Sequence, residues 1–355
     1  METMSSYADS TRAMRLKRLF TIASLIALGL SLVWANHRLD PYMVRILNLC
    51  AINIILATSL NLIFGFAGQF SLGHAGFMAV GAYACALLTM TPAQKEATFI
   101  ISPLIRPLAT IQLPFLPAIL IGGILAAIFG FIIGAPTLRL RGDYLAIASL
   151  GFAEIIRVVG NNAIPITNGA LGLKGIPEYT NLYWSWGAAA ITIFIIKRLV
   201  DSSYGRAMMA VRENEIAAEV MGVSLFYHKV LAFVIGSFFA GVGGALLANL
   251  VTTIDPKTFI FILTFNILII VVIGGLASIT GSCLAAIGYT ILLEALRPLE
   301  APMTIGPVHI PGVPGLRMVI FSLVLLAVIL FYRQGLMGKR EFGWGWLVRR
   351  MVRKT

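Results

Sequence analysis

The sequence predicts an all-α, polytopic membrane protein with about ten transmembrane helices, within a range of eight to ten. Apolar residues make up 59% of the 355 residues and charged residues only 12%, whereas a soluble domain carries roughly 25% charged residues. The mean hydropathy is +0.91. Long apolar runs also recur along the whole chain, separated by short polar segments. Together these observations exclude a soluble globular domain.

Ten apolar runs come close to the roughly 17–25 residues that a membrane-crossing helix needs. We place them at about 19–35, 43–65, 70–90, 114–136, 144–160, 182–198, 229–251, 258–276, 281–296 and 315–332. The runs at 144–160 and 281–296 are short and carry charges, so these two set the lower limit of eight spans.

Basic residues are distributed unevenly among the segments that join these runs. If the N-terminus lies inside the cell, the interior segments hold 18 of the 27 Lys and Arg residues. These segments are 1–18, 66–69, 137–143, 197–229 and 333–355. Cytoplasmic loops carry an excess of Lys and Arg, so we expect both termini to be cytoplasmic. The same rule accounts for the net charge of +12 without nucleic acid as a partner.

This topology divides the chain into three parts. A basic cytoplasmic tail covers residues 1–18, a transmembrane domain covers 19–335, and a second basic tail covers 336–355. The longest cytoplasmic loop within the transmembrane domain covers about residues 199–228. The three cysteines fall inside apolar runs, so we expect free thiols.

The first informative stretch, residues 60–77, is rich in glycine and carries polar residues within apolar sequence. The polar residues are Asn61, Gln69, Ser71 and His74. Non-helical backbone at membrane depth is tolerated only where protein or a water-filled cavity covers it, and glycines also allow close helix packing. The stretch is therefore either a tight hairpin between packed helices or part of a substrate path, and the two are compatible.

A related glycine pattern recurs late in the chain and suggests a parallel internal repeat. Gly65, Gly73, Gly81 and Tyr83 have counterparts in Gly274, Gly281, Gly288 and Tyr289. In the ten-span topology both segments turn on the cytoplasmic side and run in the same direction.

The second informative stretch, residues 141–168, places opposite charges in a predicted span. Glu154 and Arg157 lie three residues apart on one helical face, so they can pair and offset the cost of burial. The pair either fixes helix packing or contributes to a gate or substrate contact, and Asn168 follows in the exterior loop. Glu294 and Arg297 can pair in the same way.

The third informative stretch is the cytoplasmic loop. Its apolar residues predict one short helix with an apolar face, comprising Met208, Met209, Ile216, Ala217, Val220 and Met221. Gly222 then provides the residue that ends a helix, and Ser224 can cap the next helix. The polar face is mostly acidic, whereas helices that bind lipid surfaces are rich in Lys and Arg. A protein partner therefore fits better than the alternative, an interfacial helix without a partner.

Motifs for bond chemistry are missing from the sequence. There is no G-x-x-x-x-G-K-[ST] phosphate loop, no H-E-x-x-H or C-x-x-C spacing and no G-x-S-x-G. We therefore expect no enzyme activity, no catalytic residue and no metal site in this chain.

Three stretches taken together resemble one family. They are LNLIFGFAGQFSLGHAGFMAVGAY (60–83), GDYLAIASLGFAEIIRVVGNN (142–162) with TNGALGLKGIP (167–177), and GRAMMAVRENEIAAEVMGVSLFYHKVLAFVIGSFFAGVGGAL (205–246). In this order they look like the LivM/BraE-type permease subunit of bacterial branched-chain amino acid ABC importers, over about residues 45–335. The third stretch is similar to the loop through which such permeases dock on their ATPase, at Arg212, Glu213, Ala217, Ala218, Glu219 and Gly222.

The resemblance implies a permease subunit that moves Leu, Ile or Val across the bacterial inner membrane. The implied partners are a second permease of the LivH type, two ATPases of the LivG/LivF type, a periplasmic amino-acid-binding protein and membrane lipid. ATP and Mg would be bound by the ATPases and not by this chain. The residues that we expect along the substrate path or its gate are Asn61, Gln69, Ser71, His74, Glu154, Arg157 and Asn168.

Three alternatives stay open at this point. A permease of the same family for urea or short amides would share the matched motifs. An ion-coupled secondary carrier would need more intramembrane carboxylates than the two, Glu154 and Glu294, that fall in predicted spans. A membrane-embedded enzyme acting on lipid-linked substrates would need a clustered acidic or nucleophilic site, which the sequence does not show.

Overall fold

The computed structural model describes residues 23–24, 27, 29–100, 102–140, 142–300, 303–305, 308–310, 315–331, 335–338 and 341. The chain divides into two compact units, one of residues 1–44 with 340–355 and the other of residues 45–339. Residues 29–38 of the first unit are helical. The predicted tail at 1–18 lies outside the described residues, as does most of the tail at 336–355.

Every predicted span from 43–65 onward corresponds to a helix. The long helices are α2 (Pro41–Asn61) with its π-helical extension η1 (Leu62–Phe66), α3 (His74–Thr89), α6 (Phe115–Thr137), α7 (Asp143–Asn162), α9 (Leu182–Asp201), α12 (Leu225–Val251), α13 (Phe261–Gly274), α14 (Ile279–Ala295) and α15 (Leu316–Phe331). Short helices are α4 (Pro92–Thr98), α5 (Arg106–Thr110), α8 (Ile164–Thr167), η2 (Gly169–Leu171) and η3 (Arg297–Glu300). The strands are β1 (Leu173–Lys174), β2 (Thr253–Ile254), β3 (Met303–Ile305) and β4 (Val308–Ile310), paired β1 with β2 and β3 with β4.

The helix lengths confirm an all-α membrane protein. Among the described residues, four helices are long and apolar enough to cross a membrane: Pro41–Phe66, Phe115–Thr137, Tyr144–Asn162 and Leu225–Val251. The helices α3, α13 and α14 are apolar but have only 14–17 residues, which at about 1.5 Å per residue is shorter than the roughly 30 Å of a bilayer's hydrocarbon core.

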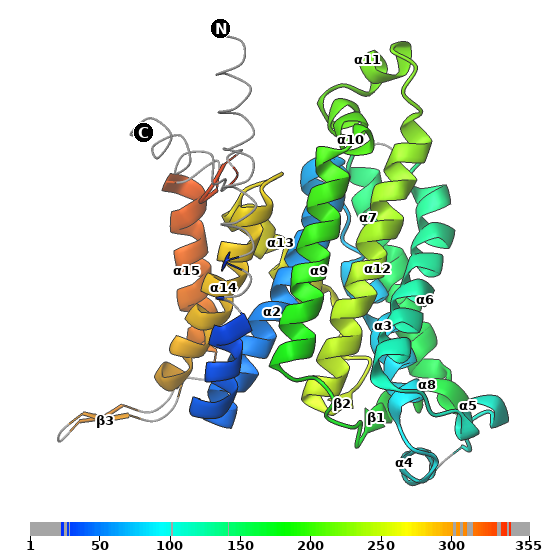
Figure 1. Ribbon diagram of the computed structural model, residues 1–355, viewed down its shortest axis with the longest axis vertical. Helices are drawn as coiled ribbons and strands as arrows, with labels where there is room; N and C mark the ends of the chain where they lie inside the picture. The colour runs from blue at the N-terminus through cyan, green and yellow to red at the C-terminus, as the bar shows by residue number, and fades with distance from the viewer. Residues whose placement is uncertain are drawn as a thin grey trace, which may run out of the picture. The chain divides into compact units, whose positions relative to one another are not determined.

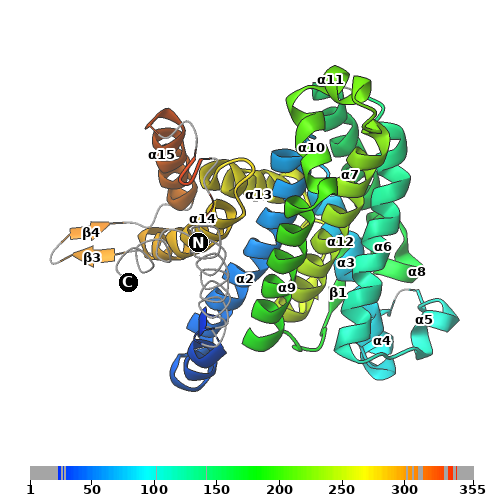
Figure 2. The same cartoon turned by 45° about the horizontal axis from the view of Figure 1, so that its top comes forward.

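Three helices, α3, α6 and α12, form the core of the larger unit and lie side by side in Figure 1 and Figure 2. Glycines let their backbones touch. A Cβ added to Gly81 of α3 would come within 2.2 Å of the Gly241 carbonyl oxygen of α12, and a Cβ on Gly122 of α6 within 2.9 Å of the Gly81 carbonyl oxygen. Lipid tails are as apolar as the side chains, so the hydrophobic effect does not drive helices together within a membrane. Close packing does, and small residues permit it.

The helices of the larger unit run back and forth between two ends (Figure 1). At one end lie α10 (Ser203–Glu213) and α11 (Glu215–Val220), and at the other lie α4, α5, α8 and the β1–β2 pair. Three of the segments predicted to be interior meet at the α10 end. Gln69 bonds to the Lys229 carbonyl oxygen at 2.9 Å, and the Arg139 guanidinium lies 6.0 Å from the centre of the Phe226 ring.

The structure differs from the prediction before α3 and in the glycine repeat. Residues 67–73 are not helical, so the predicted span at 70–90 becomes a helix only at His74, and the predicted interior segment 66–69, in which Gly68 adopts φ +70, extends to Gly73. The repeated glycines also have unlike surroundings. Gly81 touches the α12 backbone, whereas its counterpart Gly288 faces open space. The third glycine of the pattern therefore makes a close helix contact in the first segment and none in the second.

Candidate functional site

The loop between α9 and α12 contains two helices, so the prediction of one continuous helix is wrong. The break falls at Asn214, whose backbone is extended at φ −158. Its Oδ1 atom accepts a hydrogen bond from the Ala217 N–H at 3.0 Å and so caps α11. Asparagine competes with helical hydrogen bonds in this way, which favours caps over helix interiors.

The break separates the predicted apolar face into two. On α10, Met208 and Val211 are buried against the rest of the chain, at 1% and 2% exposed. On α11 and just after it, Ile216, Val220 and Met221 are 71%, 81% and 82% exposed. The apolar residues of α10 thus belong to the chain's own core, whereas those of α11 have no cover among the described residues.

The other residues predicted for ATPase contact divide in the same way. Ala217 and Glu219 are exposed on α11, whereas Ala218 is buried. Gly222 ends α11 as predicted, with φ +80. The Val223 N–H bonds to the Ala218 carbonyl oxygen and the Gly222 N–H to that of Glu219, which is the Schellman arrangement. The α11 turn is therefore fixed locally.

The next helix begins as predicted but without the expected cap. Ser224 occupies the position before the first turn of α12, yet its side chain makes no capping hydrogen bond. Its carbonyl oxygen instead accepts from the His228 N–H at 3.3 Å.

Arg212 and Glu213, at the end of α10, pair with each other but differ in exposure. The Glu213 side chain is 64% exposed and that of Arg212 only 21%. The Arg212 Nη1 atom donates to the Gly65 carbonyl oxygen of η1 at 2.6 Å. Arg212 therefore points into the chain, where the sequence alone placed it on the docking surface.

A second contact joins α11 to the start of α12 and to the break before α3. The Lys229 Nζ atom lies 2.5 Å from the Glu215 Oε1 atom, and its side chain is 11% exposed. The Lys229 carbonyl oxygen accepts from the Gln69 side chain. Gln69 is itself 2% exposed, and its Oε1 atom is buried without a partner.

Asn61 uses its side chain to join α2 to the turn between α13 and α14. Its Nδ2 atom donates to the Ser278 carbonyl oxygen at 2.9 Å and to the Ser282 hydroxyl at 2.8 Å. Its Oδ1 atom accepts from the Ala277 N–H at 3.0 Å. These bonds satisfy a fully buried amide, so Asn61 holds the end of α2 against the turn between α13 and α14.

Two further predicted residues make local contacts in the same region. The Ser71 hydroxyl accepts from the Gly73 N–H at 3.3 Å. The His74 Nε2 atom lies 3.0 Å from the Ser59 hydroxyl of α2, and its Nδ1 atom is buried without a partner. Asn61, Gln69, Ser71 and His74 thus lie around one break in the helices, but their side chains have separate partners.

Sequence reasoning missed the residues that hold this break from its other side. The Ser149 hydroxyl of α7 accepts from the Leu72 N–H at 2.9 Å. The Thr264 hydroxyl of α13 accepts from the Ala75 N–H at the start of α3, also at 2.9 Å. The available signal was a small hydroxyl residue within an apolar run, which is too common to single out these two.

The predicted ion pair on α7 is present, with the Arg157 Nε atom 2.7 Å from the Glu154 Oε2 atom. Both side chains are partly exposed, at 31% for Arg157 and 41% for Glu154. The pair predicted between Glu294 and Arg297 is present too, at 2.9 Å. The α7 pair is therefore not buried in the core.

Asn168 lies at the far end of the unit, with a left-handed backbone at φ 62. Its amide nitrogen donates to the carbonyl oxygens of Thr98 and Gly172, at 3.1 and 2.9 Å. The structure thus separates Asn168 from the residues around Gln69.

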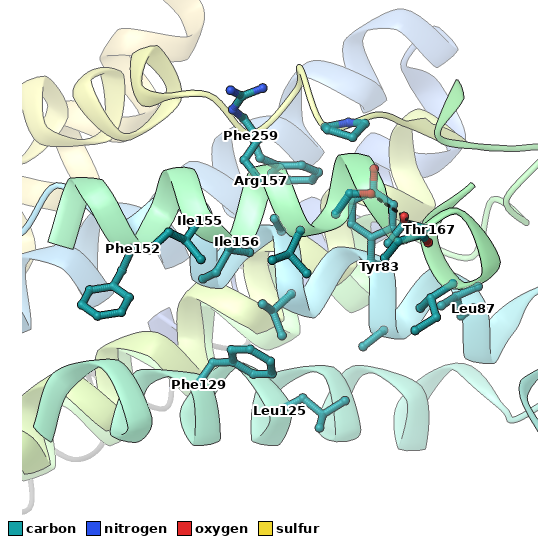
Figure 3. A pocket seen from close by; sticks show the side chains of 18 of the residues that line it. Tyr83, Leu87, Leu125, Phe129, Phe152, Ile155, Ile156, Arg157, Thr167 and Phe259 are labelled. Carbon is teal, nitrogen blue, oxygen red and sulfur yellow. Dashed lines mark hydrogen bonds between the residues drawn. The ribbon is translucent and has the colours of Figure 1, made fainter. Parts of the chain in front are cut away.

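A cavity of about 600 Å³ lies between α3, α6 and α7, and its lining is almost entirely hydrocarbon. Figure 3 shows Phe129 and Leu125 on one wall and Phe152 and Ile156 on the other, whereas Arg157 extends away from Phe129 and Leu125. The cavity can hold an apolar group but presents no charge into its interior.

Comparison with known proteins gives a consistent picture. The family described as branched-chain amino acid transport system / permease component matches residues 42–331. The high-affinity branched-chain amino acid transport system permease protein LivM of Escherichia coli (strain K12) is 33% identical over 320 residues, covering 79% of this chain and 69% of the relative. A probable LivM of Methanocaldococcus jannaschii is 25% identical, covering 81% of this chain and 90% of the relative.

A more distant likeness extends to another transport system. The L-arabinose transport system permease protein AraH of Escherichia coli (strain K12) is 28% identical over 158 residues, which is 44% of this chain and 45% of the relative. No solved structure matches the chain.

Proposed function

The chain belongs to the family of permease components of branched-chain amino acid transport systems, and we propose that it is one permease subunit of a bacterial ABC importer. It moves Leu, Ile and Val across the inner membrane as a multi-pass protein with both termini in the cytoplasm. ATP and Mg are bound by two separate ATPase subunits. A second permease and a periplasmic binding protein complete the complex.

The surface of α11 carries this proposal. Ile216, Val220 and Met221 are more than two-thirds exposed on α11 and the residue after it, at one end of the larger unit. Exposed apolar groups gathered in this way mark interaction sites. The α11 sequence, EIAAEV, contains acidic residues and no Lys or Arg, which disfavours an anionic lipid surface. A protein groove with an apolar floor and a basic rim fits better, and a dimeric ATPase supplies such a partner.

The polar residues around the break and on α7 support a path along one side of the unit. Charged side chains within membrane helices face protein or water rather than lipid. The partly exposed Glu154–Arg157 pair on α7 therefore faces the second permease or the space between the two permeases. Gln69 and His74, each with a buried unpartnered atom, lie toward the cytoplasmic end of that path, and Asn168 lies near its outer end.

A pull-down tests the proposed assembly. The tagged full chain is expressed with its neighbouring subunits and recovered in mild detergent, with the α10–α11 loop either intact or replaced by a Gly/Ser linker. We expect the intact chain to recover two ATPases and a second permease, and the linker variant to lose the ATPases. A chain that comes out alone and transports in liposomes without ATP would instead identify a secondary carrier.

Uptake measurements test the substrate. Complexes in liposomes containing ATP are supplied with the binding protein and labelled Leu. We expect unlabelled Ile and Val to compete, and urea and L-arabinose not to compete. Competition by urea alone would move the chain to the urea and short-amide branch of the family.

A further inference from the structure

Arg212 lies where a helix end leaves carbonyl oxygens without helical partners. The last four carbonyls of a helix have no N–H beyond them to bond, and Gly65 belongs to the last turn formed by α2 and η1. The Arg212 guanidinium donates to the Gly65 carbonyl oxygen at 2.6 Å. A cation is also favoured at this negative end of a helix dipole. The contact is thus favourable both as a hydrogen bond and as a charge–dipole interaction.

The end of α10 also makes close van der Waals contact with the break, in addition to the hydrogen bond. A Cβ added to Gly68 would come within 2.6 Å of Arg212 Cγ and within 3.2 Å of Arg212 Cα. The Arg212 stem and Cα at the last turn of α10 therefore pack directly on the Gly68 backbone of the break. A shift of α10 toward the membrane would press on residues 65–68.

A second connection runs in parallel through α12. Glu215, the first residue of α11, pairs with Lys229, and the Lys229 carbonyl oxygen holds the buried Gln69 side chain. Both helices of the loop are therefore joined to residues 65–69, one directly and one through the first turns of α12.

The other side of the break contacts the helices beside the proposed path. The Leu72 N–H bonds to Ser149 of α7, and the Ala75 N–H bonds to Thr264 of α13. The segment 65–75 therefore has the loop on one side and α7 and α13 on the other. It is non-helical between residues 67 and 73, so its backbone can change direction more easily than a helix can.

From these contacts we propose that Arg212 is a positioning residue that couples movement of the α10–α11 loop to the break at residues 65–73, and through the break to α7 and α13. This inference rests on the proposed function. It assigns Arg212 to transmission within the permease and not to the surface that binds the ATPase.

The test uses the full complex in liposomes and counts amino acids moved per ATP hydrolysed. Arg212→Met removes the guanidinium and keeps much of the side-chain length, and Arg212→Lys keeps the charge. Arg206→Met is the matched control, since Arg206 lies on the same helix and donates to the Asp201 carbonyl oxygen at 3.0 Å. Recovery of ATPases with each variant is measured in parallel.

We expect Arg212→Met to bind the ATPases normally and to hydrolyse ATP, while transport per ATP falls by about tenfold, within the usual range of coupling between sites. Arg212→Lys should recover part of the loss, and Arg206→Met should match the wild type. Wild-type transport per ATP in Arg212→Met would overturn the proposal. Loss of ATPases from Arg212→Met would overturn it too, because Arg212 would then belong to the docking surface.

Two further measurements separate a folding defect, and a failure of the proposed function, from a failure of this inference. If Arg212→Met does not accumulate in the membrane, Arg212→Lys and Gln69→Leu carry the test. Both must lower transport per ATP, and a wild-type ratio in either one overturns the proposal. Failure of the wild-type chain to recover any ATPase would instead refute the proposed function itself.

Discussion

The core helices pack closely against one another, whereas α11 exposes its apolar side chains. Where α3, α6 and α12 meet, glycines bring backbones into contact and leave no room for a side chain. On α11 and the residue after it, large apolar side chains stand 71–82% exposed. The first arrangement is complete within this chain, whereas the second has no cover among the described residues and is the surface that we propose binds an ATPase subunit. Substitutions in the core should therefore lower the amount of folded chain in the membrane, and substitutions on α11 should weaken the binding of partner subunits.

The largest effect is expected from Gly81→Val. Its Cβ would lie 2.2 Å from the Gly241 carbonyl oxygen, and backbone on both sides cannot yield as a flexible side chain can. Overpacking typically costs about 1–3 kcal/mol, and more where the surroundings cannot move. We expect the variant to be almost absent from the membrane, as measured by immunoblot and by thermal unfolding in detergent.

The matched control is Gly288→Val, at the counterpart position in the glycine pattern, where the added Cβ meets open space. This variant should accumulate normally. Equal loss of both variants would mean that valine in any of these helices is harmful, and that the three-helix contact has no special role.

The second-largest effect is expected from Val220→Asp on α11. Val220→Asp places a charge on a residue that is 81% exposed, so the fold itself should change by less than about 0.5 kcal/mol. Binding of the ATPases should weaken by at least about tenfold, or 1.4 kcal/mol, because an apolar contact becomes a desolvated charge. The measurement is ATPase recovery as a function of detergent-complex concentration.

Leu171→Asp is the control for that experiment. Leu171 is 50% exposed but lies beside β1, at the end of the unit opposite α11. Its substitution should leave ATPase recovery unchanged. Equal weakening by both substitutions would show that any exposed charge disturbs the complex.

The third prediction concerns the break that joins the two regions. Gly68→Val combines a β-branched residue at φ +70 with a Cβ 2.6 Å from Arg212 Cγ, and the backbone strain alone costs roughly 1–2 kcal/mol. His74→Ala removes one hydrogen bond to Ser59, worth about 1 kcal/mol, and the packing of a ring that is 1% exposed, but it leaves the backbone of the break unchanged. Uptake kinetics should therefore show a larger loss for Gly68→Val. The reverse order would place the imidazole, and not the backbone, at the centre of function.

How far the sequence could predict these regions depends on the range of the interaction. The pairs Glu154–Arg157 and Glu294–Arg297, each three residues apart, and the helix end at Gly222 follow from local spacing, and the structure contains all three. The long apolar helices follow from hydropathy in the same way.

Long-range contacts could not be predicted in this way. The Arg212–Gly65 bond joins residues 147 apart in the sequence, and the contact of Gly81 with Gly241 depends on how α3 meets α12. The helix break at Asn214 was missed because asparagine is only mildly unfavourable inside a helix. The break coincides with the Asn214 cap on α11, and a single sequence does not reveal whether such a residue caps a helix or lies within one.

The smallest effect is expected at the end of the unit opposite α11, where the Lys95 side chain is 1% exposed. Its Nζ atom donates to the carbonyl oxygens of Leu108 and Ile111, at 2.7 and 2.5 Å, and burial lowers the pKa of Lys95 below its usual 10.5. Between the lowered pKa and 10.5 the unfolded chain binds more protons than the folded chain, so stability rises with pH in that window. The thermal midpoint in detergent should therefore rise slightly as the pH approaches 10.5.

Lys95→Met separates this effect from the other titrating groups. The variant lacks the ammonium, so its midpoint should lose the part of the rise that belongs to Lys95, while ATPase recovery stays as in the wild type. If Lys95→Met instead released the ATPases, the two ends of the unit would be coupled, and the division between a core complete in itself and a docking helix at one end would fail.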